Sequence, residues 1–341
     1  PSKDNKNLTA KYLKNENLPV IKPAWQGNPV DEKDRFINEG FPFLSNFSDL
    51  LKWQFSSNPQ AEEKENDQAR LTVKDPTAFL QSNSDGILWL GHAGFFIRLN
   101  GLSIIIDAVF GKPPLVKTFV DVPSPLDIIR QLDFILVSHD HRDHADEAAI
   151  RQLTKKFPTA GILAGLRMDD LLNEWKTLSN KVQTAGWYQQ FTLPPADLKI
   201  YFLPARHWSR RGLFDTNQRL WGAFVIQSAS KTIYFGGDSG YDKHYQKLSA
   251  LFPKIDYFIV GIGAYKPRWI MQPNHNSPAE AVQGFVDSKA GFLIPMHYGQ
   301  FNLSDEPAGE PLRFLREAAR AKNVSDKLKI LQINESLILS N

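Results

Sequence analysis

The sequence predicts a domain of the α/β or α+β class, and two observations support this. From residue 87 onward, short β-rich runs alternate with helical patterns, and the second half of this region repeats the style of the first. Two similar halves of mixed strands and helices favour two sheets packed between helices. With 341 residues, of which 42% are hydrophobic and 12% aromatic, the chain is long enough to bury a substantial core.

The elements follow in a regular order along both halves. In the first half we expect strands at 87–90, 95–99, 103–106, 134–137 and 161–164, and helices at 146–156 and 168–176. In the second half we expect strands at 199–203, 223–227, 232–235, 257–260 and 292–295, helices at 278–287 and 311–321, and a final strand pair near 328–339.

Residues 1–84 are polar and less regular, and we predict that they form an N-terminal extension beside a catalytic domain at 85–341. Within the extension, residues 47–55 place apolar side chains at spacings close to three and four, as on one face of a helix. We favour a helix packed on the main domain. The alternative is a lipid-facing helix, because Trp and Phe next to Lys suit a membrane interface.

A dense histidine cluster follows the apolar run at 134–137. It reads Ser138-His139-Asp140-His141-Arg142-Asp143-His144, an H-x-H-x-D-H pattern. Imidazole nitrogen and carboxylate oxygen suit zinc and other borderline divalent ions. The spacing is too tight for all four side chains to bind one tetrahedral ion without severe backbone strain. The pattern therefore indicates two ions.

Three further candidate ligands stand at the ends of later strand-like runs. His207 follows 198–206, Asp238 follows 232–237 and His297 follows 291–296. A single histidine after a strand is more often an ordinary interior or surface residue, but the repetition, together with the cluster, favours ligands. His244 lies in a helical pattern without such a context, and we interpret it as a surface residue.

The order of these residues resembles the metal-ligand signature of metallo-β-lactamase-fold hydrolases. Within that superfamily, the chain is most similar to the branch that contains the phospholipase D acting on N-acylphosphatidylethanolamine and its bacterial relatives. The segments that carry this similarity are Trp89–Ala93, Pro204–Arg211, Leu220–Gly222, Gly237–Tyr241, Gly261–Trp269, His275 and Met296–Gly299. The resemblance implies an α+β fold, a four-layer αββα sandwich of two mixed β-sheets flanked by helices.

The resemblance also implies a ligand set and a reaction. His139, His141 and His207 would hold one ion, Asp143, His144 and His297 would hold the other, and Asp238 would bridge them. Two ions about 3.5–4 Å apart can share a water, lower its pKa and deliver a metal-bridging hydroxide to a phosphoryl or acyl centre. We expect two zinc ions per chain, with iron and manganese as alternatives.

Asp143, Asp238 and His275 are the predicted catalytic residues. His275 corresponds to a histidine that lies near the metals in the family, and it can protonate a leaving group or bind an oxyanion; the alternative is that it only caps its loop. Asp107 can accept a proton from a ligand imidazole, or it can be a simple turn carboxylate. His92 is expected to contact a ligand or to be structural.

Four residues are candidates for binding a substrate phosphate, because guanidinium forks bind phosphate bidentately. They are Arg210, Arg211, Tyr265 and Arg268, although each alone is more often an ordinary surface residue. The leading reaction is phosphodiester hydrolysis of an N-acylphosphatidylethanolamine-like phospholipid, of the phospholipase D type. The alternative is hydrolysis of a lactone or carboxylic ester. The loop between Asp107 and Asp133 is shorter than in the family, so one wall of the pocket is expected to differ.

Composition disfavours several other classes. The chain has no cysteine, which excludes disulfides, thiolate ligands and a cysteine nucleophile. Its net charge of +3, from 40 basic and 37 acidic residues, does not indicate a nucleic-acid partner. An iron oxidoreductase of this fold would usually carry a glutamate at position 141, and a metal-free binding module would be expected to have lost ligands.

We expect a small-molecule or phospholipid substrate, with peripheral membrane contact as an option, and the sequence predicts no oligomeric state. No apolar run is long enough to span a bilayer, and residues 1–7 lack the apolar region of a signal peptide. Because the chain begins at Pro1, we expect an upstream segment to have been removed by processing or by design. The expected location is soluble or peripheral, in the cytoplasm or, after signal removal, in the cell envelope.

Overall fold

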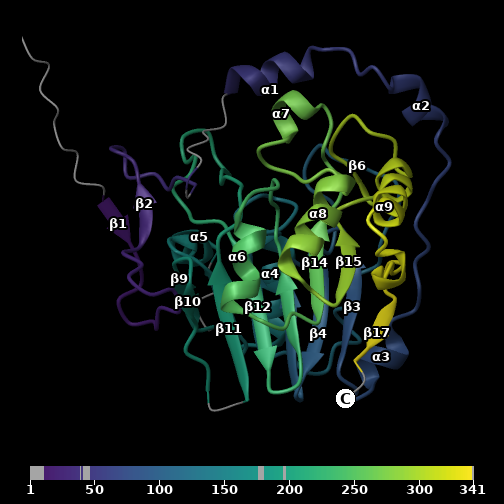
Figure 1. The fold of residues 1–341 in the computed structure, drawn as a ribbon. Coiled ribbons are helices and arrows are strands. Elements are labelled where there is room, and N and C mark those ends of the chain that lie inside the picture. Colours follow the sequence, from purple (N-terminus) through teal and green to yellow (C-terminus); the bar gives the residue numbers. More distant parts are fainter. Residues whose placement is uncertain (1–10, 39, 41–46, 176–179, 195–196, 340–341) are drawn as a thin grey trace, which may run out of the picture.

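Two large β-sheets pack face to face between helices in the computed structural model, which describes residues 11–38, 40, 47–175, 180–194 and 197–339 (Figure 1). The first sheet has seven strands, in the order β17 (Ser336–Ile338), β3 (Gly86–Gly91), β4 (Gly94–Leu99), β5 (Leu102–Ile106), β7 (Phe134–Val137), β8 (Gly161–Gly165) and β9 (Val182–Ala185). The second has six, in the order β10 (Gln189–Gln190), β11 (Leu198–Leu203), β12 (Ala223–Ser228), β13 (Thr232–Phe235), β14 (Tyr257–Gly261) and β15 (Phe292–Met296).

Both sheets are mixed. Strands β3, β4 and β5 are antiparallel neighbours, whereas β5, β7, β8 and β9 run parallel. In the second sheet, β10 to β13 are antiparallel and β13, β14 and β15 are parallel. The carboxyl ends of the parallel strands therefore meet at one end of each sheet, and the loops that follow them are brought together.

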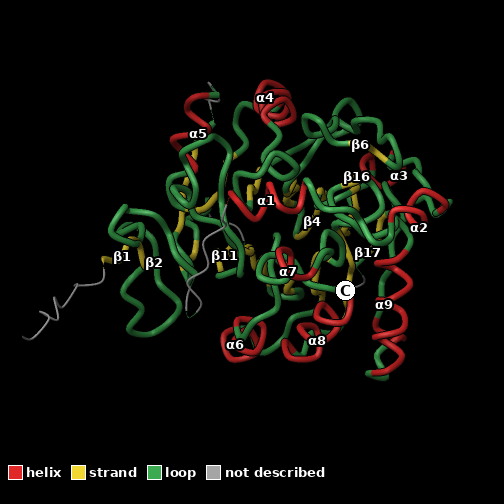
Figure 2. The backbone as a smooth tube through the Cα atoms, turned by 90° about the horizontal axis from the view of Figure 1, so that it is seen from above, coloured by secondary structure: helices red, strands yellow, loops and turns green. Residues whose placement is uncertain are grey.

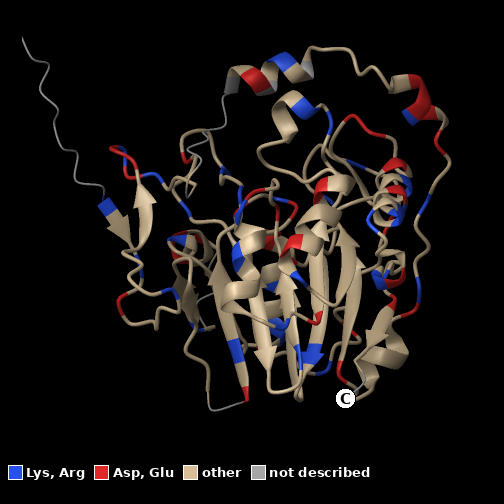
Figure 3. Cartoon of the chain, viewed as in Figure 1, with Lys and Arg blue, Asp and Glu red and all other residues tan. Residues whose placement is uncertain are grey.

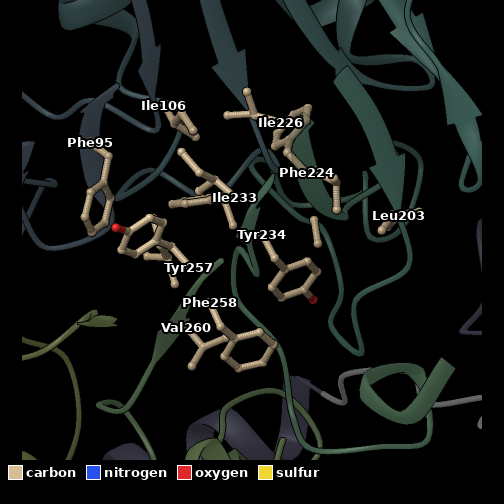
Figure 4. Packing of buried hydrophobic residues seen from close by; sticks show 14 of the residues in the cluster. Phe95, Ile106, Leu203, Phe224, Ile226, Ile233, Tyr234, Tyr257, Phe258 and Val260 are labelled. Atoms are coloured by element: carbon tan, nitrogen blue, oxygen red, sulfur yellow. The ribbon is translucent and has the colours of Figure 1, made fainter. Parts of the chain in front are cut away.

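The apolar strand residues form the core because both faces of the sheets are covered. On β3, Ile87 and Trp89 join the cluster between the sheets, while Leu88 and Leu90 join a second cluster beneath helices. Figure 4 shows Phe95 and Ile106 of the first sheet together with Ile233 of the second. Most charged residues lie on helices and loops outside these strands (Figure 3).

Helices cover the outer faces of the two sheets. The first sheet is covered by α3 (Thr77–Gln81), α4 (Glu147–Lys156) and α5 (Met168–Glu174), and the second by α6 (His244–Leu251), α8 (Pro278–Ser288) and α9 (Glu310–Ala321). Asp146 caps α4, and Ser277 with Glu280 forms a capping box on α8. These layers confirm the predicted αββα sandwich.

The N-terminal part is more regular than the sequence suggested. A hairpin of β1 (Lys11–Leu13) and β2 (Asn28–Val30) is followed by α1 (Phe47–Gln54) and α2 (Ala61–Asn66). Strands of three residues are too short for alternation to reveal them. Leu18, Val30 and Phe36 join the main core, so this part packs on the rest of the molecule, and its division from a catalytic domain at residue 84 stays a prediction.

Some expected boundaries differ. Of the final strand pair, only β17 forms a strand among the described residues. Leu328 makes an isolated bridge to Leu293, and Ile333 makes one to Val73. The short helix η1 (Ser325–Lys327) directly precedes Leu328. Helix α5 ends at Glu174, and the expected end at residue 176 lies outside the described residues, as do residues 1–7. Among the described helices, none combines the length and the apolar character needed to cross a membrane.

Short elements complete the end of the molecule where the parallel strands stop. Helix α7 (Arg268–Met271) lies next to α1 above the strand ends, and Figure 2 looks down on this pair. Strand β6 (Lys117–Thr118) pairs with β16 (Phe301–Asn302) at the same end. The loops and helices here surround the predicted metal ligands, and we call this the metal end.

Candidate metal centre

All seven predicted ligands meet at the metal end. The cluster His139, His141, Asp143 and His144 follows β7, while His207, Asp238 and His297 follow β11, β13 and β15. Because the four strands stop at one level, residues more than 150 positions apart come within reach of each other. The seven ligands are buried, except His141 and Asp143, which are half-buried.

The side chains form two adjoining groups. In each group one nitrogen or oxygen atom per residue lies within 4.8 Å of the others. One group holds Asp143, His144 and His297 with His92, and the other holds His139, His141 and His207 with Asp238. These two groups are compatible with the ligand allocation that the family resemblance implied, with His92 added, and that allocation stays a prediction. Smaller groups overlap them, such as Asp238 with His275 and His297.

Asp238 faces both groups. Its Oδ2 atom lies 3.2 Å from His144 Nε2 and 3.8 Å from His207 Nε2, and its Oδ1 atom lies 3.2 Å from His297 Nε2. A carboxylate in this position can bind one ion with each oxygen. The geometry thus suits the bridging role expected of Asp238.

Several atoms of the predicted ligands make no hydrogen bond within the described part of the chain. They are His141 Nε2, His144 Nε2, His297 Nδ1, His297 Nε2 and Asp238 Oδ1, all of them buried. Buried polar atoms are normally hydrogen-bonded, and leaving one unpaired costs about 1–3 kcal/mol. Unpaired imidazole nitrogens beside carboxylate oxygens are what a divalent cation of the zinc type requires. The described residues therefore fit a metal centre.

The electrostatics of the site also attract a cation. Burial alone would lower the pKa of His297, but Asp238 and Asp143 raise it to about 9. His144 behaves in the same way, since the two carboxylates raise its pKa well above 6.5 against the effect of burial. The group around Asp143 thus favours positive charge, whether a proton or a metal ion supplies it, whereas burial lowers the pKa of His139, His141 and His207.

A layer of hydrogen bonds orients the ligands from behind. Asp107 Oδ2 lies 2.8 Å from His144 Nδ1, and Asp107 also accepts from the Ser138 backbone and hydroxyl. His92 Nε2 lies 3.0 Å from Asp143 Oδ2, and the Asn274 carbonyl lies 3.0 Å from His207 Nδ1. Such partners fix the tautomer and the direction of a ligand.

Three residues of the site have left-handed backbone conformations. His92, Asp107 and His297 have φ values of 44°, 44° and 63°. Non-glycine residues adopt such values at a cost and persist in them where the surrounding structure enforces it, often at functional sites. The strain here falls on one ligand and on the two side chains that contact ligands.

A cavity of about 310 Å³ opens onto the ligands. His275 lines it, with Nδ1 3.7 Å from Asp238 Oδ2, so the structure places this predicted catalytic residue beside the metal donors. The apolar walls come from Trp208 and Leu303 and from α7, whose Trp269, Ile270 and Met271 face the cavity. The predicted metal ligands therefore form the polar base of a cavity whose other walls are largely apolar.

None of the four predicted phosphate-binding residues lines this cavity. Arg211 donates to the carbonyls of Asp140 and Ala145, and Arg268 forms a bidentate ion pair with Glu280. The Tyr265 hydroxyl donates to Glu310. Arg210 Nε donates to the Gly212 carbonyl. These side chains stabilise loops in the structure, and their role in binding a phosphate stays a prediction.

Sequence reasoning missed other residues of the cavity. Arg142 stands inside the histidine pattern and Trp208 follows His207, so both were visible next to ligands. Asp49, from α1, lies far away in sequence and gave no signal. His244 is half-buried rather than at the surface, with Nε2 3.2 Å from the Ser239 hydroxyl, because α6 begins directly beneath the Asp238 loop.

Comparisons with known proteins identify the family. The Beta-lactamase superfamily domain matches residues 103–298, more than half of the chain, and the chain therefore belongs to this superfamily. Among solved structures, Igni18, a metallo hydrolase from Ignicoccus hospitalis, superposes with a TM-score of 0.58 at 18% identity, covering 76% of this chain and 99% of that one. The fold is thus that of metallo-β-lactamases. The chain is also 30% identical to a metal-dependent hydrolase of Caldivirga maquilingensis over 214 residues, which are 62% of this chain and 82% of that protein, and it is itself a metal-dependent hydrolase.

Two curated relatives are similar over most of the chain. One is the N-acyl-phosphatidylethanolamine-hydrolyzing phospholipase D 1 of Caenorhabditis elegans, 29% identical over 323 residues, which are 89% of this chain and 88% of that protein. The other is the mitochondrial N-acyl-phosphatidylethanolamine-hydrolyzing phospholipase D of Saccharomyces cerevisiae, 29% identical over 325 residues. That match covers 92% of this chain and 64% of the yeast protein.

Proposed function

We propose that the chain is a zinc-dependent phosphodiesterase that holds two ions and hydrolyses an N-acylphosphatidylethanolamine-like phospholipid. The observation that carries this proposal is the cavity, in which apolar walls enclose a floor of metal donors. Such a site suits a molecule with a polar scissile group and an apolar remainder. The two relatives that are similar over most of the chain bear names of this activity, which supports the choice of substrate.

The predicted ligands and His275 would have different roles in this reaction. His139, His141 and His207 would hold one ion, Asp143, His144 and His297 the other, and Asp238 both. When bound, the ions supply an activated water and polarise the phosphoryl group. His275 faces the same cavity; burial lowers its pKa to about 4, so its neutral imidazole can donate a hydrogen bond to charge that develops on the substrate.

Substrate assays in parallel would test this reaction. Zinc-loaded protein is incubated with an N-acylphosphatidylethanolamine, with bis(p-nitrophenyl) phosphate and with a panel of lactones. We expect turnover of both diesters, with release of an N-acylethanolamine from the lipid. Turnover of lactones by a protein that leaves both diesters intact would contradict the proposal and favour the ester hydrolase expected as the alternative.

We further propose that the metal end contacts a membrane surface. The most exposed large apolar side chains among the described residues are Phe55, Leu115, Leu213 and Phe214, each more than 70% exposed. All four belong to segments of the metal end: Phe55 follows α1, Leu115 precedes β6, and the other two lie in the loop after His207. Exposed apolar side chains at the end of the molecule that holds the cavity suit insertion into an acyl-chain boundary.

Vesicle sedimentation would test this contact. Phe214→Ser should reduce binding to phospholipid vesicles, because it removes one of these exposed side chains. Ile338→Ser is the matched control, since Ile338 is 52% exposed on β17, which lies near the C-terminus at the opposite end of the molecule (Figure 1). Equal binding by the two variants would contradict a membrane contact at the metal end.

A further inference from the structure

The cavity over the metal donors contains two charged residues that are not ligands. Its described lining includes Arg142 and Asp49 in addition to the ligand carboxylates. Arg142 stands between His141 and Asp143, so the backbone that positions two predicted ligands also positions Arg142 at the cavity. The side chain is exposed, unlike the ligands beside it.

Arg142 differs from the other arginines of this region, because the described part of the chain offers it neither a hydrogen-bond partner nor an ion-pair partner. Arg219 pairs with Asp140 and Asp215, Arg268 with Glu280, and Arg211 is bound to two carbonyls. No hydrogen bond or ion pair holds Arg142 among the described residues. Its fork of donors is therefore available to a ligand.

Carboxylates lie near Arg142, among them Asp49 in the same cavity, but none of them forms an ion pair with it within the described part of the chain. Burial, followed by the nearby positive charge of Arg142, lowers the pKa of Arg211 to about 10. The adjacent carboxylate of Asp143 is engaged with His92 and faces His297. A cation left in this position beside a substrate cavity favours an anion as its partner.

We propose that Arg142 is the residue that recognises the anionic group of the substrate, as a specificity determinant for phosphodiesters over neutral esters. This inference deepens the proposed function and rests on it for the identity of the scissile group. The planar guanidinium can donate two parallel hydrogen bonds to two oxygens of one phosphate. Arg142 is not among the candidate metal ligands, so its proposed role is in recognition rather than in the metal centre.

Binding of a diester that cannot be turned over readily tests the inference without relying on catalysis. The titration of dimethyl phosphate into zinc-loaded protein is followed by calorimetry for the wild type, Arg142→Gln, Arg142→Lys and Arg130→Gln. Arg130 is the matched control, because it is an exposed arginine in the loop before β7, at the opposite end of that strand from Arg142. The zinc content of each variant is measured first.

The expected result is a loss of affinity of about tenfold or more in Arg142→Gln, in keeping with a lost charge-assisted hydrogen bond. The affinity of Arg142→Lys should lie between those of the wild type and Arg142→Gln, since lysine keeps the positive charge but cannot donate two parallel hydrogen bonds. Arg130→Gln should bind as the wild type does. A wild type that does not bind dimethyl phosphate, or an Arg142→Gln variant with equal zinc content and unchanged affinity, would overturn the inference.

A turnover measurement separates this inference from the proposed function. The ratio of kcat/KM for bis(p-nitrophenyl) phosphate to that for p-nitrophenyl acetate should fall about tenfold or more in Arg142→Gln. If the wild type hydrolyses no diester, the proposed function fails, while the calorimetry still decides whether Arg142 binds a phosphate. If the wild type hydrolyses diesters and the ratio stays unchanged, the proposed function stands and the role of Arg142 is overturned.

Discussion

Two clusters of ionisable side chains adjoin the metal end, and they differ in how their polar atoms are paired. In the metal centre, nitrogens of His141, His144 and His297 have no hydrogen-bond partner among the residues that the structure describes. In the second cluster, which we call the Glu306–Glu310 cluster, Glu310 accepts from Tyr265, Lys266 and Gln60, and Glu306 accepts from the backbone of Tyr265 and Lys266.

The contrast separates a binding site from a structural one. A cluster that satisfies its own donors and acceptors fixes one arrangement of the chain. A cluster that leaves buried atoms unpaired is incomplete without a partner from outside the chain. We therefore expect substitutions in the metal centre to act on metal content and activity, and substitutions in the Glu306–Glu310 cluster to act on stability.

The largest effect is expected from Asp238→Asn. Because Asp238 faces both groups of ligands, its loss should reduce the bound metal from about two ions to one or fewer. Activity should fall by more than the roughly 10–100-fold that is usual when only a residue supporting a ligand is lost. Elemental analysis and a diester assay would measure this, with Asp326→Asn, an exposed residue of η1, as the control. If Asp238→Asn still bound two ions, the contrast between a metal-binding centre and the structural Glu306–Glu310 cluster would be contradicted.

Asp107→Asn should have the next largest effect. The Asp107 carboxylate contacts the Nδ1 atom of His144 and also accepts hydrogen bonds from Ser138. The amide of the asparagine variant would therefore disturb the orientation of His144. We expect metal affinity to fall by about 10–100-fold. Competition for zinc with a coloured chelator would show it. Ser138→Ala removes one of these contacts and should lower the metal affinity less than Asp107→Asn does. A larger loss of affinity in Ser138→Ala would contradict the role assigned to Asp107.

Tyr265→Phe should act on stability alone. It removes a donor from buried Glu310, at a cost of about 1–3 kcal/mol in the free energy of unfolding. Urea unfolding would measure this cost. Metal content and the KM for a diester should stay at the wild-type values, because the hydroxyl is turned to Glu310 rather than to the cavity. A raised KM would restore the phosphate-binding role that the sequence suggested.

The smallest effect is a pH dependence from Glu306. Burial raises the pKa of Glu306 above 4.5 in the folded chain. Its contribution to stability is therefore complete below pH 4.5 and is lost as the pH rises through the folded pKa, by about 1.4 kcal/mol for each unit of the shift. The difference in unfolding free energy between the wild type and Glu306→Gln should decrease over this range. Glu317→Gln, at an exposed site on α9, is the control variant.

The sequence predicted the metal centre well because a dense cluster of histidines has few structural roles other than metal binding. The histidine cluster and the ligands at strand ends could be predicted because each follows an apolar run, and parallel strands bring their ends together. Partners of arginines and tyrosines could not be predicted, since Arg268 meets Glu280 and Tyr265 meets Glu310 only through tertiary packing. Asp49 reaches the cavity from α1, a placement that no local pattern encodes.

The central claim, a centre for two metal ions, is tested most directly by counting ions. Protein purified without chelator and supplied with zinc is analysed by plasma emission spectroscopy for the wild type, Asp143→Ala and His207→Ala, which alter different groups of ligands. We predict about two zinc ions in the wild type and one or fewer in each variant. A wild type that binds no metal after zinc is supplied would contradict the account, and the unpaired histidines would then need another partner.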